Sequence, residues 1–308
     1  MSETVGGLGS KANSRRTSDT AVVLFVYEGS LPFLFQALVS ISQQDDEDFD
    51  VILINDGIVG LAEKCESIGL RQININIIHI SGTIPQIRKR GLKNIIAHGY
   101  HYLIFGDADD LFPANRIRLA KSFLQHSDIV VNDIRPFGEA GYYANKPYFS
   151  TRLVNNQVLT KTDLLNANMM GFTNTAIRAS SIPELLLPDD LIAVDWALYA
   201  QLIEAGAIAV FTSETYSRYR IHQANHCTLG ACQPDTFLTH LDVKLRHYQN
   251  LSQALPGLNS KFQKVKALAV KMKDHQFRDR YINYVMKNKI AYPFWWEDVG
   301  LTFRELHQ

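Results

Sequence analysis

The chain has 308 residues, of which 46% are hydrophobic, and this length is sufficient for one large domain with an appendage. Its 31 Lys and Arg residues balance its 31 Asp and Glu residues, so no global charge attracts nucleic acid, and we expect no nucleic-acid partner. Three cysteines, Cys65, Cys227 and Cys232, are too few for a disulfide framework and indicate reduced thiols.

The first 20 residues are rich in Ser, Gly and Thr and lack the apolar core of a secretory signal. We interpret residues 1–20 as a disordered tail, with a transit peptide as the alternative. No apolar run in the sequence is long enough to span a bilayer, so we expect no transmembrane segment. The predicted location is the cytoplasm, with peripheral attachment to the inner face of the membrane left open.

Five short apolar runs are typical of strands buried in a sheet. They span residues 21–27, 49–54, 73–80, 102–105 and 129–131. Between them, apolar residues recur at helical spacing at residues 31–44, 59–70 and 84–97, and Pro113 marks the start of a further helix. This alternation predicts an α/β protein with a Rossmann-like, mostly parallel sheet flanked by helices.

The alternation becomes irregular beyond about residue 134. The remaining predicted elements are, in chain order, a hairpin at 141–154, a helix at 195–205, strands at 207–212 and 215–221, and helices at 241–251 and 260–286. The predicted fold therefore ends in a helical C-terminal extension.

Acidic residues follow the carboxyl ends of several predicted strands. Glu28, Asp56 and Asp107 each come just after one, and ligands of parallel sheets bind at this edge. The run Asp107-Ala108-Asp109-Asp110 brings together three carboxylates, which repel one another unless a cation or hydrogen-bond donors are near. Hard oxygen ligands favour Mg²⁺ or Mn²⁺, and these ions commonly bridge to phosphate oxygens. The alternative for this run is a solvated turn that caps a helix.

The other motifs are weak evidence for a functional site when each is taken alone. Asn55-Asp56-Gly57 is also typical of an ordinary turn, and Arg88 could be an ordinary solvent-facing residue of a helix. Their order is more informative. Six motifs follow one another: Phe25-Val26-Tyr27-Glu28, Asn55-Asp56-Gly57-Ile58, Ile87-Arg88-Lys89-Arg90-Gly91, Gly106-Asp107-Ala108-Asp109-Asp110, Val194-Asp195-Trp196 and Tyr219-Arg220-Ile221-His222. In this order and spacing, residues 21–226 resemble the inverting glycosyltransferases of family 2, which have the glycosyltransferase A fold.

Five positions depart from the pattern of that family. Phe25 stands where the family has Pro, Glu28 where it has Asn, Ile58 where it has Ser, Lys89 where it has Asn, and Val194 where it has Glu. The positions with the most direct chemistry, Asp56, Asp109 and Asp195, match. The departures therefore bear on donor preference more than on the reaction.

The resemblance implies a nucleotide-sugar site made of six residues: Tyr27, Glu28, Asp56, Arg88, Asp107 and Ala108. Tyr27, Asp56 and Arg88 are expected to hold the base, presumed to be uracil, since a carboxylate accepts its N–H and a guanidinium donates to its oxygen. Asp107 is expected to contact the ribose or the metal.

The resemblance also implies a metal ion and a general base. Asp109 is expected to bind Mn²⁺ or Mg²⁺, with His222 as a second ligand or, alternatively, a structural residue. Asp195 is the expected catalytic base, a role compatible with that of an acid in the first turn of a helix. Arg220 is a weaker candidate for a contact with the diphosphate. Trp196 is a weaker candidate for a wall of the acceptor pocket, and the alternative for Trp196 is core packing.

The implied activity is that of a metal-dependent inverting glycosyltransferase of the hexosyl- or N-acetylhexosaminyltransferase class. It moves a sugar from a nucleotide sugar, presumed to be UDP-linked, to a hydroxyl of a glycan or glycolipid, in glycan or polysaccharide synthesis. The implied catalytic domain spans residues 21–233, with a nucleotide-sugar half at 21–133 and an acceptor half at 134–233. Residues 234–308 form a helical region, through which homodimerisation is left open.

Alternatives remain at this stage. Asp107-Ala108-Asp109 after an apolar strand is also typical of haloacid-dehalogenase phosphatases, although these place the motif on an early strand and continue with Gly-Thr. A non-catalytic nucleotide- or sugar-binding protein is a second alternative, against which the presence of Asp195 argues. The segment Phe294-Trp295-Trp296 is interpreted as packing the terminal helices, or as a self-association or membrane-surface patch. A zinc site at Cys227 and Cys232 is a minor alternative.

Overall fold

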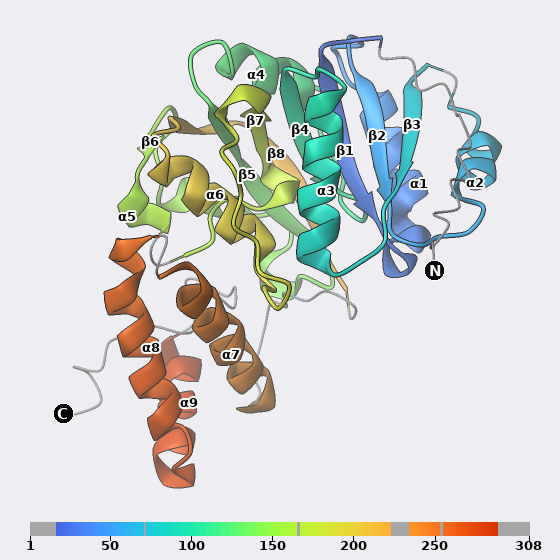
Figure 1. Ribbon diagram of the computed structural model, residues 1–308. Coiled ribbons are helices and arrows are strands. Elements are labelled where there is room, and N and C mark those ends of the chain that lie inside the picture. The colour runs from blue at the N-terminus through green and yellow to red at the C-terminus, as the bar shows by residue number, and fades with distance from the viewer. Residues whose placement is uncertain (1–16, 71, 165–166, 223–233, 253–254, 289–308) are drawn as a thin grey trace, which may run out of the picture.

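One sheet of eight strands, in the order β3-β2-β1-β4-β7-β5-β8-β6, forms the centre of the protein (Figure 1). The computed structural model describes residues 17–70, 72–164, 167–222, 234–252 and 255–288. The strands are β1 (Thr20–Val26), β2 (Asp50–Asn55), β3 (Asn74–His79), β4 (Tyr102–Asp107), β5 (Ile129–Gly138), β6 (Val158–Leu159), β7 (Thr175–Arg178) and β8 (Ala209–Ile221). The predicted α/β class, with a mostly parallel sheet flanked by helices, is confirmed.

The helices that flank the sheet cover two separate cores. They are α1 (Leu31–Ser42), α2 (Leu61–Ile68), α3 (Ile84–Ala97), α4 (Arg116–Phe123), α5 (Lys161–Leu164) and α6 (Val194–Glu204). On β1, Val22 and Leu24 face the core under α1, α2 and α4, while Val23 and Phe25 face the core under α3 and α6. Because β1 is buried on both faces, its apolar run is continuous rather than alternating.

The predicted bounds of α3 are confirmed, and a cap explains them. The Oγ1 of Thr83 accepts a hydrogen bond from the backbone N–H of Gln86, and the Gln86 side chain accepts one from the backbone N–H of Thr83. Pro85 lies in the first turn, where its missing N–H costs nothing. This capping box directs α3 back along the sheet so that Arg88 faces the strand ends.

The sequence did not indicate β7, which is four residues long and runs antiparallel to both β4 and β5. The predicted hairpin at 141–154 is wrong, since the described chain there forms two short 3₁₀ turns, Gly141–Tyr143 and Phe149–Thr151. The carboxylate of Asp133 accepts hydrogen bonds from the backbone N–H groups of Tyr148 and Phe149. These amides are therefore satisfied outside any strand ladder.

The two strands predicted at 207–212 and 215–221 are one strand, β8. It pairs in parallel with β5, and the register shifts between Asn132 and Asp133, where β8 carries extra residues. This bulge bends β8 without ending it. As a result β8, whose first residues pair with the edge strand β6, reaches the turn that follows β4.

Three helices follow the sheet: α7 (Pro234–Leu251), α8 (Asn259–Lys271) and α9 (His275–Asn288). They project from the sheet below α5 and α6 (Figure 1). The predicted helical extension is confirmed, but the single helix at 260–286 is wrong, because a new helix begins after Asp274. The Asp274 carboxylate accepts a hydrogen bond from the backbone N–H of Phe277, as an N-cap does.

The described structure begins inside the predicted tail. The side chain of Thr17 donates a hydrogen bond to Asp50, the backbone N–H of Ser18 lies 3.3 Å from the same carboxylate, and Thr20 starts β1. Residues 226, 227, 232 and 294–296, which carried sequence predictions, lie outside the described part of the chain.

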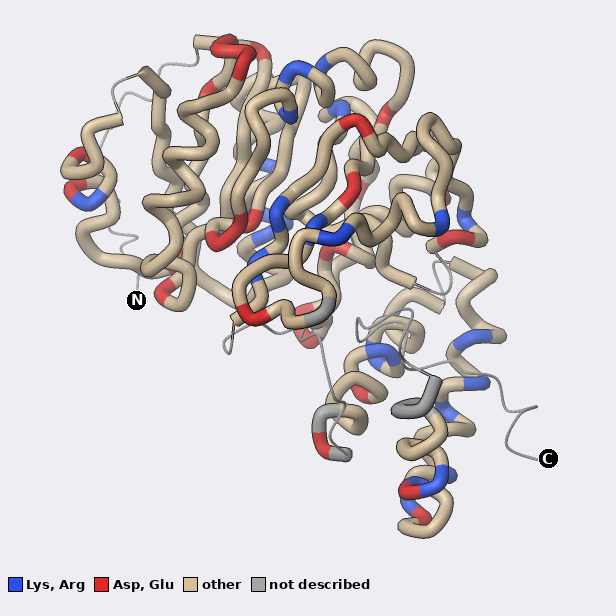
Figure 2. Tube along the Cα trace, turned by 180° about the vertical axis from the view of Figure 1, so that it is seen from behind, with Lys and Arg blue, Asp and Glu red and all other residues tan. Residues whose placement is uncertain are grey.

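Within the described residues, no helix is long and apolar enough to cross a membrane. Lys and Arg are interspersed with Asp and Glu over the same part of the chain (Figure 2).

Candidate active site

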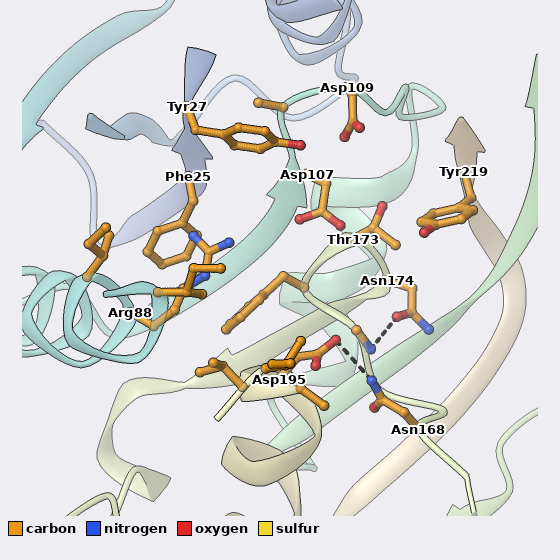
Figure 3. Close-up of a pocket in the computed structure, with 18 of the residues that line it drawn as sticks. Phe25, Tyr27, Arg88, Asp107, Asp109, Asn168, Thr173, Asn174, Asp195 and Tyr219 are labelled. Atoms are coloured by element: carbon orange, nitrogen blue, oxygen red, sulfur yellow. Dashed lines mark hydrogen bonds between the residues drawn. The ribbon is translucent and has the colours of Figure 1, made fainter. Parts of the chain in front are cut away.

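A cavity of about 460 Å³ lies at the carboxyl ends of β1, β2 and β4 (Figure 3). Its wall also includes α3, the segment 168–174, the first turn of α6 and one face of α7. Seven of the residues singled out in the sequence line it: Tyr27, Asp56, Arg88, Asp107, Ala108, Asp109 and Asp195. Residues from segments far apart in the chain thus meet at the edge where a ligand of this sheet is expected.

The Arg88 side chain is fixed on aromatic rings. Its guanidinium carbon lies 3.6 Å from the centroid of the Phe25 ring and 5.1 Å from that of Phe172. Burial lowers the pKa of Arg88 to about 10, and the charges of Asp107 and Asp195 act against this shift. Phe25, which departs from the family pattern, therefore supplies a flat support for a cation that faces the cavity.

The acidic turn after β4 separates its carboxylates. Asp107 lines the cavity, and burial, followed by the charge of Asp109, raises its pKa to about 7. Asp110 is buried and points elsewhere, accepting hydrogen bonds from the Thr173 side chain and from the backbone N–H of Arg220 (2.7 Å). Asp110 thus holds the turn in place and leaves the other two carboxylates to a ligand.

Gly106 allows this turn to lie against its neighbours. A Cβ at that position would come within 2.5 Å of Phe112 Cζ and 2.8 Å of Leu24 Cδ2. No side chain fits without moving a core residue of β1. The glycine therefore sets how closely Asp107 approaches the end of β1.

Asp109 and His222 are in direct contact. The Nε2 of His222 lies 3.0 Å from the Oδ2 of Asp109, and both side chains are nearly buried. The end of β8 is held at this turn because the Nε of Arg220 donates to the backbone oxygen of Asp109 (2.6 Å). The His222 ring also packs on Phe33, with centroids 4.7 Å apart. Two residues that are 113 positions apart thus share one small volume.

This pair has the chemistry of a partial metal site. The described residues contain no group of three or more His, Cys, Asp or Glu side chains that could hold a metal ion. Asp109 and His222 offer one carboxylate and one imidazole, and Asp107 adds negative charge nearby. Mg²⁺ is commonly held by one or two carboxylates together with substrate phosphates and water. The donor set therefore fits a cation that binds together with a phosphorylated ligand.

Tyr27 covers the acidic turn, with its ring above Asp107 (Figure 3). Burial, followed by the charges of Asp109 and Asp107, raises the pKa of Tyr27 to about 12, so the phenol stays neutral. A Cβ on Gly29 would lie 2.9 Å from Tyr27 Cε2, so this glycine leaves room for the ring. Tyr27 consequently presents an aromatic face at the cavity mouth.

Asp195 lies in the first turn of α6, across the cavity from Asp109 (Figure 3). Its Oδ2 accepts a hydrogen bond from the Nδ2 of Asn168 (3.0 Å), and its Oδ1 accepts one from the backbone N–H of Trp196 (2.8 Å). Burial raises the pKa of Asp195, although these hydrogen bonds and Arg88 oppose the shift. The carboxylate is therefore a stronger base than a solvated one.

Four residues singled out in the sequence do not line the cavity: Glu28, Trp196, Arg220 and His222. Glu28 is exposed on the 3₁₀ turn Glu28–Ser30. Trp196 is fully buried, donates from Nε1 to the backbone oxygen of Leu164 and stacks on His247, so it packs the core. Arg220 contacts Asp109 and Gln36. His222 contacts Asp109, which lines the cavity.

Several lining residues carried no recognisable signal in the sequence. They are Asn168, together with Thr239, His240 and Val243 of α7. Each is a single residue in an irregular segment or on a helix with an ordinary apolar pattern. Only the packing of α7 against α6 brings the last three to the cavity.

No protein-family model matches the chain. An uncharacterized glycosyltransferase of Rickettsia felis is 24% identical over 169 residues, which are 53% of this chain and 27% of that relative. The chain therefore spans about a quarter of the length of the curated relative it matches. The name of this relative agrees with the prediction of a glycosyltransferase.

Solved structures share the fold. Staphylococcus aureus TarS (residues 1–349) in complex with UDP-GlcNAc has a TM-score of 0.56 at 14% identity, covering 93% of this chain and 77% of TarS. The mannosyltransferase PcManGT of Pyrobaculum calidifontis, in complex with GDP-Man and Mn²⁺, has a TM-score of 0.56 at 12% identity, with 91% and 77% covered. The sheet and its acidic edge thus define a glycosyltransferase A fold, and the predicted fold is confirmed.

Proposed function

We propose that this protein is a metal-dependent inverting glycosyltransferase that moves a sugar from a UDP-linked donor to a hydroxyl of a glycan or glycolipid. The observation that carries the proposal is that five charged side chains from four separate segments line one cavity: Asp56, Arg88, Asp107, Asp109 and Asp195. The name of the Rickettsia felis relative and the nucleotide sugars in the solved neighbours support it.

The donor base binds between β2 and α3 in this proposal. The Asp56 carboxylate accepts the N–H of uracil, and the Arg88 guanidinium, supported by Phe25, donates to a uracil oxygen. Tyr27 lies against the flat face of the base or ribose. Because the planar Arg88 side chain is already ordered, little conformational entropy is lost on binding.

The diphosphate binds near the acidic turn after β4. Asp109 and His222 would hold a divalent cation there, with Asp107 facing the ribose or the same ion. When bound, Mn²⁺ or Mg²⁺ screens the diphosphate and stabilises the charge on the departing nucleotide.

Asp195 serves as the general base. It takes the proton of the acceptor hydroxyl as that oxygen forms its bond to the anomeric carbon, and the bond from this carbon to the nucleotide phosphate breaks on the opposite face. The configuration at the anomeric carbon is thereby inverted. Because burial raises the pKa of Asp195, its carboxylate accepts a proton more readily than a solvated one.

The direct test follows UDP release from UDP-sugars with Mn²⁺, with and without glycan acceptors. Asp195→Asn should keep UDP binding and lower acceptor-dependent transfer by about 100-fold or more, because the general base is gone. Asp163→Asn, a change on α5 outside the cavity, is the matched control. If Asp195→Asn transfers sugar at the wild-type rate, the assignment of the base is wrong. If the wild type binds UDP and transfers no sugar, the protein is a nucleotide-binding protein instead.

A further inference from the structure

We propose that Asn168 is a positioning residue that orients the Asp195 carboxylate. This inference rests on the proposed function, because it gives Asn168 its task through the general base. Asn168 lies between α5 and the 3₁₀ turn Phe172–Asn174, and its side chain is directed at Asp195 (Figure 3).

Two donors outside Asp195 itself bind different oxygens of its carboxylate. The backbone N–H of Trp196 donates to Oδ1, and the Nδ2 of Asn168 donates to Oδ2. The first donor belongs to the residue next to Asp195 and moves with it. Asn168 is 27 positions away, so its hydrogen bond fixes the carboxylate relative to the rest of the cavity.

The segment that carries Asn168 is itself held in place. The Nδ2 of Asn174 donates to the backbone oxygens of Met169 and Asn132, and the backbone N–H of Gly171 donates to the Oδ1 of Asn174 (2.8 Å). A Cβ on Gly171 would lie 3.5 Å from the Oδ2 of Asp195. The segment therefore passes close to the carboxylate, and its anchoring makes Asn168 a fixed donor.

Asn168 itself is almost fully buried, with 6% of its surface exposed. Its Oδ1 has no hydrogen-bond partner among the described residues, whereas its Nδ2 has Asp195. A buried amide oxygen without a partner costs folding free energy. The contribution of this side chain therefore lies in the hydrogen bond that it donates.

Charged and titratable groups face Asp195 from each neighbouring element. They are Arg88 of α3, Asp107 of β4 and Tyr199 of α6 itself. His240 of α7 lines the same cavity. Arg88 favours the ionised carboxylate, but it also faces Asp107 and Asp56. The neutral donor of Asn168 stabilises the ionised form of Asp195 without adding a charge that would compete for the donor phosphates.

Two substitutions test the proposal. Asn168→Ala should lower kcat about tenfold or more, leave the KM for the UDP-sugar within about twofold, and move the acidic limb of the kcat–pH profile to higher pH. Asn168→Asp puts a second carboxylate beside Asp195 and should move that limb further. Asn155→Ala is the matched control, because its side chain bonds Thr212 and Glu214 outside the cavity.

A ¹³C NMR titration measures the pKa of the Asp195 carboxyl directly, without relying on activity. The Asp195 signal is identified as the one that is absent from the spectrum of Asp195→Asn. In Asn168→Ala its midpoint should rise. An unchanged midpoint and pH profile in an active enzyme overturn the positioning role, as does a loss of kcat that only follows a loss of folded protein. A wild type that transfers no sugar overturns the proposed function and this inference with it.

Discussion

His222 adds an imidazole nitrogen to the carboxylate oxygens of the acidic turn after β4. Three carboxylates in one turn are equally consistent with a solvated loop, but Asp109 is nearly buried and 3.0 Å from an imidazole. A solvated loop has no need for such a partner, whereas a cation site uses a mixed oxygen and nitrogen donor set. The side chains that could hold a cation therefore come from the end of β8 as well as from the turn after β4.

His222→Gln should weaken Mn²⁺ binding by about tenfold or more. Even the mutation of an outer-shell partner of a metal ligand typically lowers metal affinity by this much. The measurement is a Mn²⁺ titration of UDP binding by calorimetry. His126→Gln, a change on the exposed surface after α4, should leave the titration unchanged. Equal Mn²⁺ dependence in His222→Gln and the wild type would remove His222 from the metal site.

Residues differ in how far the sequence reveals them. Asp56, Arg88 and Asp195 are recognisable through the order of their motifs, and all three line the cavity. Asn168 is not recognisable, because a lone asparagine in an irregular segment has no spacing to a partner. Its contact with Asp195 exists only after α6 and the segment 168–174 have packed together.

Among the elements, α6 and α7 form the contact that closes the cavity. Trp196 of α6 stacks on His247 of α7, with ring centroids 4.0 Å apart and an interplanar angle of 19°. His247 is fully buried, and neither ring nitrogen has a hydrogen-bond partner among the described residues. Burial, followed by the charge of Lys244, lowers the pKa of His247 to about 3. The neutral imidazole therefore packs as an aromatic ring, and burial of its two unpaired nitrogen atoms lowers the stability of the fold.

His247→Phe should raise the free energy of unfolding by about 1 kcal/mol at pH 7.5, since it keeps the stack and removes two unpaired polar atoms. It should also make the protein less sensitive to acid. The unfolded His247 binds a proton below about pH 6.5 and the folded one does not, so wild-type stability falls by up to about 1.4 kcal/mol per pH unit below that point.

Urea denaturation at pH 7.5 and pH 5 measures both effects. His247→Ala, which removes the ring from Trp196, should be less stable than the wild type at pH 7.5. The interpretation is wrong if His247→Phe and the wild type lose stability in parallel between the two pH values.

Elements with local signals were predicted well. The strands of the parallel half are β-branched runs, and α3 has its own cap, so their type and place follow from nearby residues. β7 was missed because four residues carry too little pattern, and its antiparallel pairing depends on the register of β4 and β5. The hairpin at 141–154 was wrong because one buried side chain, Asp133, takes up its amides.

At the scale of the whole molecule, the two halves of the sheet both contribute residues to the candidate site. β1, β2 and β4 carry Tyr27, Asp56 and Asp107, and β8 carries His222 to the same edge. A ligand that bridges these parts binds only the folded chain. Its binding therefore adds to the stability of the whole molecule.

UDP with Mn²⁺ should raise the thermal unfolding midpoint by about 5 °C, because a ligand at 100 times its Kd contributes about 2.7 kcal/mol. GDP and ADP with Mn²⁺ should give smaller shifts if Asp56 and Arg88 read uracil. Differential scanning fluorimetry with each nucleotide, with Mn²⁺ and with EDTA, is the measurement. An equal shift for all three nucleotides would contradict the assignment of the base.

The position of α7 has a consequence for how this protein can be divided. Thr239, His240 and Val243 form part of the cavity wall, and Trp196, next to Asp195, is covered by the same helix. A fragment cut at residue 233, where the sequence suggests that a catalytic domain ends, would leave an opened cavity and an uncovered indole. The smallest fragment that keeps the candidate site intact therefore extends at least to Leu251, and any graft or fusion should include all of α7.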